Sequence, residues 1–173
     1  SLIEIIIPSS VYSIGDECFY GCKSLKQVSL SSSIKIFEIL VFGECTSLTQ
    51  ISIPSSVTKI EFGAFDACRS LKHVSIPSSV TEIDIMAFKE CTSLKEIEIP
   101  PNVKKIKKDT FNNCTSLLTV NLSNVEKIKR HAFYGCASLK RVDIPPSVKL
   151  IEEFAFGECT SLVHVSFSSS VNT

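Results

Sequence analysis

Apolar residues recur along the chain in one arrangement that repeats with a long, fixed period. In the stretch "LKHVSIPSSVTEIDIMAFKECTS" (71–93), apolar side chains stand at Leu71, Val74, Ile76, Val80, Ile83, Ala87, Phe88 and Cys91. The cysteines of the pattern lie at Cys22, Cys45, Cys68, Cys91, Cys114, Cys136 and Cys159, in steps of 23 residues with a single step of 22. Each follows a Phe by three positions and precedes a Leu by three. A period held over the whole chain indicates a repeat architecture.

Each repeat predicts a strand, a turn and a short helical turn. "LKHVSI" (71–76) ends in alternation, with Val74 and Ile76 expected to face inward. Pro77 ends the strand because it cannot donate to a ladder. Ala87, Phe88 and Cys91 then fall on one face of a single helical turn. The one-residue deletion lies in "LSNVEKI" (122–128), where the "PSS" turn shrinks to "SN".

No single repeat can bury these side chains unless another repeat lies on either side of it. The sequence therefore predicts a right-handed solenoid of 23-residue repeats. A parallel β-sheet covers one face, and short helical or 3₁₀ turns cover the other. We expect one domain over residues 1–173, with about seven full repeats and a partial one.

The unit L-x-x-V-x-I-P-x-x-V-x-x-I-x-x-x-A-F-x-x-C-x-S-L resembles the BspA-type leucine-rich repeat over essentially the whole chain. It departs from the commoner leucine-rich pattern because Pro-Ser-Ser stands where an Asn ladder would follow the strand. The resemblance implies a cell-surface or secreted, adhesin-like protein that binds host or extracellular-matrix proteins. Two other interpretations remain open: an intracellular scaffold or regulatory module, and a sensor segment of a larger multidomain protein.

The ends of the sequence carry no polar cap. Leu2, Ile5 and Ile7 are typical of an ordinary strand, and "VSFSSSVNT" (165–173) breaks off inside a repeat. Since terminal repeats usually replace their outward apolar columns with polar residues, we expect the chain to be a segment of a longer array. The alternative is a short protein with exposed ends.

Composition and charge add little that favours chemistry. The formal net charge is zero, which gives no support to a nucleic-acid partner. No apolar run is long enough to insert into a bilayer. The three histidines, His73, His131 and His164, fall in different repeats or on different flanks. The serine before each Leu is periodic, whereas a catalytic residue occurs once. We therefore expect a non-enzymatic interaction module that needs no cofactor or metal.

Specificity is expected in the outward columns, which packing leaves free to vary. The strand face carries the candidate partner-binding residues Gln50, His73, Glu96, Glu98, Thr119, Asn121, Arg141 and Asp143. Its side chains are polar, mixed in sign and without the aromatic anchors that favour hot spots. A solvated sheet without a ligand is the alternative.

Two further surfaces are candidates. The middle repeats place the apolar residues Ile39, Leu40, Phe62, Ile85 and Met86 where other repeats are mostly charged. They indicate either a contact surface or side chains folded inward over a wider turn. A basic cluster follows: Lys104, Lys105, Lys107, Lys108, Lys127, Lys129 and Arg130. It could hold an acidic glycan or protein, and the alternative is a solvated flank.

The repeated cysteines are expected to be buried thiols stacked in a ladder. Their Cβ atoms should lie about 4.8 Å apart, beyond the usual disulfide range of roughly 3.5–4.5 Å. Four thiolates in a line cannot surround a zinc ion. Cys18 breaks the period and shares one turn with Cys22, so a disulfide between these two remains open.

Overall fold

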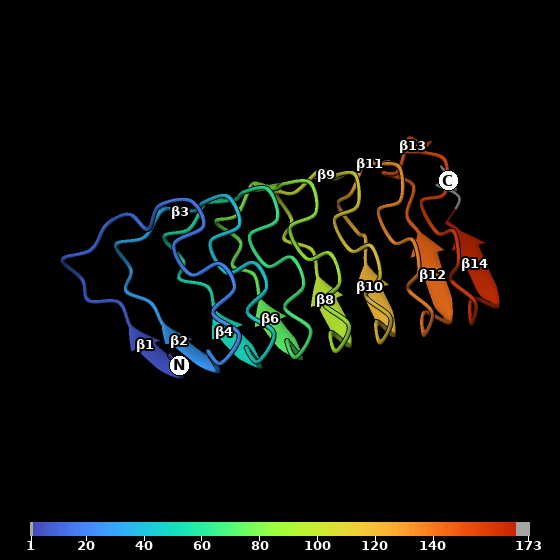
Figure 1. Cartoon of the computed structure of the whole chain (residues 1–173). Helices are drawn as coiled ribbons and strands as arrows, with labels where there is room; N and C mark the ends of the chain where they lie inside the picture. The colour runs from blue at the N-terminus through green and yellow to red at the C-terminus, as the bar shows by residue number, and fades with distance from the viewer. Residues whose placement is uncertain (1, 169–173) are drawn as a thin grey trace.

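The computed structural model describes residues 2–168, and these form about seven turns, followed by the first strand of an eighth, that run side by side along one axis (Figure 1). Strands of a first row give one face: β1 (Glu4–Ile6), β2 (Gln27–Ser29), β4 (Gln50–Ser52), β6 (His73–Ser75), β8 (Glu96–Glu98), β10 (Thr119–Asn121), β12 (Arg141–Ile144) and β14 (His164–Phe167). The predicted ends of the domain, residues 1 and 173, lie outside the described residues.

A second row of two-residue strands lies further along each turn, where the sequence predicted only inward-facing residues. It consists of β3 (Ile36–Phe37), β5 (Lys59–Ile60), β7 (Glu82–Ile83), β9 (Lys105–Ile106), β11 (Lys127–Ile128) and β13 (Leu150–Ile151). In the strands of this row from β3 to β11 one residue, such as Ile60 or Ile83, is buried and points into the core, whereas both residues of β13 are exposed. Such strands are too short to show alternation, so periodicity alone could not reveal them.

All strand pairing is parallel, with equivalent residues of successive repeats opposite one another. The first row is paired two by two, as β1–β2, β4–β6, β8–β10 and β12–β14. The second row is paired in two groups of three, as β3–β5–β7 and β9–β11–β13. The predicted parallel sheet is therefore present but interrupted.

The predicted helical turns on the opposite face are wrong in detail, because the residues described there form turns rather than helix. Two positions in each repeat hold a left-handed backbone: one two residues before the Phe, as at Leu40 and Met86, and one two residues after it, as at Ala67 and Glu90. A positive φ at these intervals stops helical hydrogen bonding after a single turn.

These turns, which we call the loop row, form a third ladder between repeats. In the turn around Phe65, the N–H groups of Gly63, Phe65 and Ala67 donate to Ile85, Ala87 and Lys89 of the next turn, at 3.0, 2.8 and 2.7 Å. The N–H groups between them bond within their own turn, as from Asp66 to the Gly63 carbonyl at 2.8 Å. Successive N–H groups thus bond alternately to the next turn and within their own turn. The hydrogen-bonding groups of the loop backbone are therefore satisfied without a helix or a sheet.

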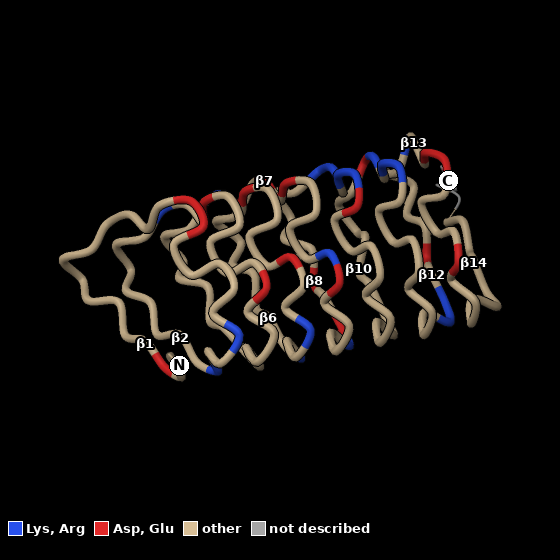
Figure 2. Tube along the Cα trace, in the orientation of Figure 1, with Lys and Arg blue, Asp and Glu red and all other residues tan. Residues whose placement is uncertain are grey.

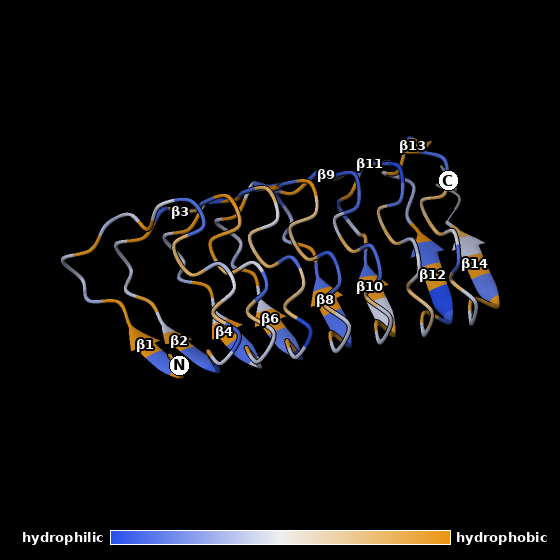
Figure 3. Ribbon diagram, in the orientation of Figure 1, coloured by the Kyte–Doolittle hydropathy of each residue, from blue (hydrophilic) through white to orange (hydrophobic). Residues whose placement is uncertain are grey.

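The core lies between the rows and consists of columns of like residues. Phe42, Phe65, Phe88, Phe111 and Phe133 are completely buried, and consecutive rings stack with centroids 5.2–5.8 Å apart. Leu, Ile, Val and Cys columns run beside them, whereas the outward residues of the strands are mostly hydrophilic (Figure 3). Phe19 and Phe156, in the outermost turns, are only partly buried.

The shortened repeat is absorbed in the turn between β10 and β11. In the turns that begin with a proline, a Val N–H donates to the proline carbonyl, as from Val103 to Pro100 at 3.0 Å. Here Val125 donates to Leu122 at 2.9 Å, and Leu122 is buried. The deletion therefore costs the turn its proline but leaves the strands on both sides in register.

Candidate binding surfaces

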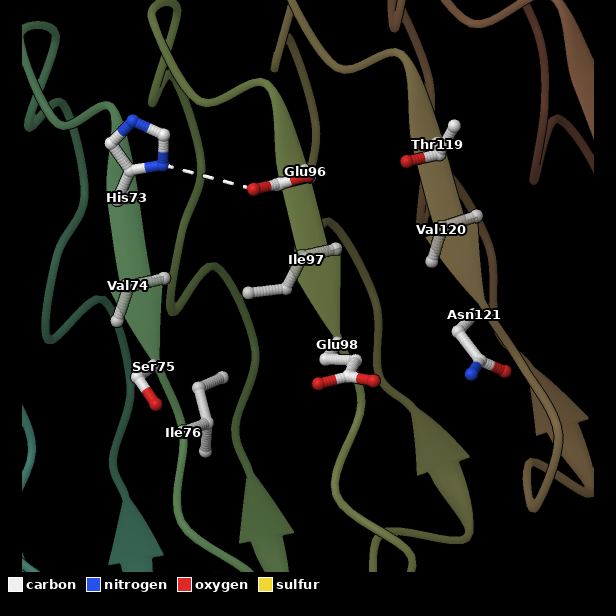
Figure 4. Close-up of a pocket in the computed structure, with 10 residues that line it drawn as sticks. All are labelled: His73, Val74, Ser75, Ile76, Glu96, Ile97, Glu98, Thr119, Val120 and Asn121. Atoms are coloured by element: carbon white, nitrogen blue, oxygen red, sulfur yellow. Dashed lines mark ion pairs between the residues drawn. The ribbon is translucent and has the colours of Figure 1, made fainter.

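The predicted strand-face residues all lie exposed on the outward side of the first row. Gln50 lies opposite His73, Glu96 opposite Thr119, and Glu98 opposite Asn121. His73, Glu96, Glu98, Thr119 and Asn121 line an open groove of about 540 Å³ across β6, β8 and β10, and Figure 4 shows them on the three strands; Gln50 lies on β4, outside the groove's lining. Arg141 and Asp143 lie on β12, beyond the groove's lining.

The groove is acidic. Its only ion pair among the described residues joins His73 Nδ1 to a Glu96 oxygen at 3.9 Å. Glu98 makes no ion pair within residues 2–168. On β12, by contrast, the Arg141 guanidinium bonds the Asp143 carboxylate at 2.9–3.2 Å and holds the pKa of Asp143 below its usual range. The two carboxylates of β8 are thus available to a partner, whereas that of β12 is already engaged.

The apolar cluster is only partly exposed. Ile39 and Phe62 are 39% and 37% exposed, whereas Leu40, Ile85 and Met86 are half-buried. Leu40 lies across two glycines: a Cβ on Gly63 would come within 2.7 Å of Leu40 Cδ2, and one on Gly43 within 3.0 Å. Leu40 therefore covers the loop backbone, while Ile39 and Phe62 keep a small apolar surface on adjacent turns.

The basic cluster begins where the flank changes from acidic to basic along the solenoid (Figure 2). Most of its charges are paired. Lys107 contacts Glu82 and Asp84 at 2.5 and 2.9 Å, and Lys108 contacts Asp109 at 3.7 Å. Arg130 contacts Glu153 at 3.2 Å, and Lys129 contacts Glu152. Lys104 donates to the Pro101 carbonyl at 2.9 Å.

Four lysines of this flank, Lys104, Lys105, Lys127 and Lys149, make no ion pair among the described residues. Lys105 and Lys127 lie opposite one another on β9 and β11, and neither makes an ion pair within the described chain. Lys104 and Lys149 are exposed close by, because Glu126 bonds through its backbone to both of them. The unpaired positive charge of this flank is therefore carried by Lys104, Lys105, Lys127 and Lys149.

The cysteines form the predicted buried ladder, with a contact that the sequence did not reveal. From Cys45 to Cys159, each Sγ lies 3.1–3.3 Å from the carbonyl oxygen of the Phe one repeat before, with geometry for S–H donation. Burial raises the pKa of Cys45 and Cys114 to about 12. Since the thiolate is the reactive form, these thiols are inert. All eight cysteines are thiols, but Cys18 is exposed and Cys22 half-buried.

Residues 2–168 contain neither a metal-binding group of side chains nor a membrane-spanning helix. No three His, Cys, Asp or Glu side chains there are grouped so as to hold a metal ion. Within the same residues, no helix has the length and hydropathy needed to cross a membrane.

These features define the class: a solenoid of leucine-rich repeats. The family model for the BspA type leucine rich repeat region, six copies, matches residues 1–118 and 86–173. The chain belongs to this family of BspA-type leucine-rich repeat proteins, whose fold is one of protein interaction. A search of curated proteins returned no match.

Solved structures show the same architecture. A leucine-rich cell surface protein from Faecalibacterium prausnitzii is 27% identical, with a TM-score of 0.70 over 98% of this chain and 61% of that one. A leucine-rich repeat protein from Bacteroides ovatus is 28% identical, with a TM-score of 0.59 over 95% and 56%. One from T. pallidum is 28% identical, with a TM-score of 0.62 over 80% and 78%. The chain thus spans about three-fifths of the first two relatives.

Proposed function

We propose that this chain is a non-enzymatic protein-binding segment of a cell-surface or secreted, adhesin-like protein. The observation that carries the proposal is the acidic groove across β6, β8 and β10, whose polar side chains differ from turn to turn while the core columns beneath them do not. In a repeat protein, the residues that determine binding specificity are expected to vary from repeat to repeat on one exposed face. The description of the F. prausnitzii relative as a cell surface protein supports the location.

The partner we propose is a host surface or extracellular-matrix protein that presents basic side chains to the groove. Glu96 and Glu98 supply two carboxylates on one strand, and the nearby His73 is the only basic group that pairs with either within residues 2–168. Complementary charge mainly sets the rate of association and the orientation of a partner. A scaffold or sensor role in a larger protein would use the same groove for a different partner.

The test is binding of the purified chain to a panel of immobilised extracellular-matrix proteins. Reversing the charge of the groove with Glu96→Lys and Glu98→Lys should weaken binding about tenfold or more, since each close charge pair lost costs more than 1 kcal/mol. Arg141→Glu, at the edge of the same face, should have a smaller effect. Glu158→Lys makes the same change on the exposed loop row and serves as the control.

Binding that survives all three reversals would place the contact elsewhere, on Ile39 and Phe62 or on the basic flank. Failure of every matrix protein to bind would reject the adhesin assignment. Neither result depends on loss of folding, because all of the altered side chains are exposed.

We also propose a second, smaller site for an acidic glycan at Lys105 and Lys127. The observation that favours it is the adjacency of these two unpaired lysines, with Lys104 and Lys149 beside them. Lys105→Glu with Lys127→Glu should lower the salt concentration that elutes the chain from a heparin column. Lys140→Glu, an exposed lysine at the entrance to β12, should not. Equal elution of all variants would show that no such site exists.

A further inference from the structure

One junction between turns differs from all the others. Between the turn of β6 and β7 and the turn of β8 and β9, neither the first nor the second row is paired in the described structure. At each other junction among residues 2–168 at least one of the two rows is paired. The second row is paired within β3–β5–β7 and within β9–β11–β13, and the first row is paired at the two ends of the array, as β1–β2 and β12–β14. We call this place the mid-array junction.

The backbone hydrogen bonds that cross the mid-array junction lie on the loop side. Met86, Phe88 and Glu90 donate from the backbone to Lys108, Thr110 and Asn112, at 3.2, 3.0 and 2.8 Å. Phe88 stacks on Phe111 with ring centroids 5.6 Å apart, and the Cys114 thiol lies 3.2 Å from the Phe88 carbonyl oxygen. The loop row is therefore as complete here as at any other junction.

On the strand side the junction is bridged mainly by side chains. Lys107, after β9, reaches back across the junction to Glu82 and Asp84, at 2.5 and 2.9 Å. All three side chains are at most 39% exposed, so water and salt screen their attraction only in part. The other bridges are weaker: Asn102 donates to the Ser78 carbonyl at 2.9 Å, and His73 meets Glu96 at 3.9 Å.

Open space lies over the junction on both rows. The groove of about 540 Å³ spans β6, β8 and β10 on the first row. A second hollow of about 260 Å³ is lined by Thr81, Glu82, Ile83, Asn102, Lys104, Lys105 and Lys107 on the second. The outward faces of both rows are therefore open at this junction, and the ion pairs of Lys107 are the main side-chain contacts there that must break when the two turns move apart.

We propose that the solenoid opens at the mid-array junction, with Lys107 as the clamp that limits the opening. The turns before and after it act as two stacks joined by the apolar core, by the loop row and by the ion pairs of Lys107, but by no backbone pairing between strands. The groove over β6 and β8 lies on the same junction, so its width changes when the stacks separate. The inference does not depend on which partner the groove binds.

The buried thiols on the two sides of the junction report its opening without any added label. Cys91 belongs to the last turn before the junction and Cys114 to the first turn after it, and both are completely buried. Under native conditions a thiol reagent reaches them only when turns separate, so the labelling rate measures the opening. Mass spectrometry of peptides then assigns a rate to each cysteine.

We expect Cys91 and Cys114 to be labelled several-fold faster than Cys68 and Cys136, one turn further out on each side. An array that merely frays from its ends gives the opposite order, because its central turns are the most protected. Finding Cys91 and Cys114 to be the slowest of the four would overturn the proposal.

A matched pair of variants tests the clamp. Lys107→Met removes the charge and keeps the stem, and should speed labelling of Cys91 and Cys114 about fivefold, the size of effect expected from a partly exposed ion pair. Lys129→Met removes the equivalent ion pair to Glu152 at a junction where β11 and β13 are paired, and should leave both rates unchanged. An equal change at all four thiols, or none with Lys107→Met, would show that Lys107 is no clamp.

Discussion

Each repeated cysteine occupies a site that requires a small side chain and in which its S–H group acts as a weak hydrogen-bond donor. The Phe carbonyl that receives the thiol already accepts the N–H of the cysteine in its own turn, as from Cys68 to Phe65 at 3.2 Å. The S–H of Cys91 then fills the second acceptor position of the Phe65 carbonyl. A recurring "ECTSL" is thus a packing and hydrogen-bonding unit rather than a disulfide code.

Thiol accessibility follows from this arrangement. In the native protein at pH 8 we expect Cys18 to react first with a thiol reagent and the six thiols from Cys45 to Cys159 to be protected, since burial keeps them protonated. Cys18→Ser should remove the fast phase. In denaturant without reductant all eight should react, and a count below six would show that disulfides bridge the ladder.

Within an element, the loop row depends on residues that tolerate a left-handed backbone. Gly63 has φ of +59°, and its missing side chain leaves room for Leu40 of the previous turn. Leu40 and Met86 adopt similar angles without being glycine, which costs each of them roughly 1 kcal/mol or more. The stacking of one turn on the next therefore outweighs local preference along this row.

Gly63→Ala should destabilise the protein by about 1–3 kcal/mol, because a Cβ there meets Leu40 and the backbone angle disfavours Ala. Urea unfolding should show part of the loss recovered in the double variant with Leu40→Ala, since the clash is then gone. Gly15→Ala is the matched control, with ordinary φ and no atom within 4 Å of the new Cβ. Equal losses at both glycines would contradict this account of Leu40.

At the scale of the whole molecule, stability is a sum over turns and junctions between neighbours. Interior turns bury their Phe between two others: Phe88 lies 5.2 Å from Phe65 and 5.6 Å from Phe111 between ring centroids. Phe156 stacks within the described chain on Phe133 alone, at 5.3 Å, and is partly exposed. The contribution of a Phe to the free energy of unfolding therefore depends on its position along the array.

Phe88→Ala should lower the free energy of unfolding by about 3–5 kcal/mol, the usual cost of emptying a buried aromatic site. Phe156→Ala should cost clearly less, because its site is partly open. Chemical denaturation monitored by circular dichroism measures both. Losses of the same size would argue against a stack whose stability is set by nearest neighbours.

The repeat period predicted the solenoid, the first strand row, the Phe stack and the burial of the cysteine ladder, because each depends on a side chain that recurs in the sequence. The second strand row and the third ladder could not be predicted, since they are made by backbone groups that every residue carries. The same limit applies to left-handed positions occupied by Leu40 or Met86, which no propensity favours.

The sequence predicted which residues of the candidate surfaces point outward, but not which of their charges are paired. The strand-face columns lie in the predicted positions because strand alternation fixes which residues point outward. The charge of the flank could not be predicted, since the partners of Lys107 and Lys129 come from neighbouring turns, 23–25 residues away. Similarly, the loss of pairing at the mid-array junction has no counterpart in the residue pattern.

The register of the ladders has a consequence for how such a gene can change. Every backbone hydrogen bond between turns joins residues about one repeat apart. The contacts therefore depend on the position of a residue within its repeat and not on the number of repeats. A recombination event between two near-identical "ECTSL" segments removes or adds whole turns and leaves each new neighbour with the same kind of contacts. The turn around Ser123 shows that a single residue can also be lost where a turn absorbs the change, because the strands on both sides keep their register. We therefore expect arrays of this kind to change in length mainly by whole repeats.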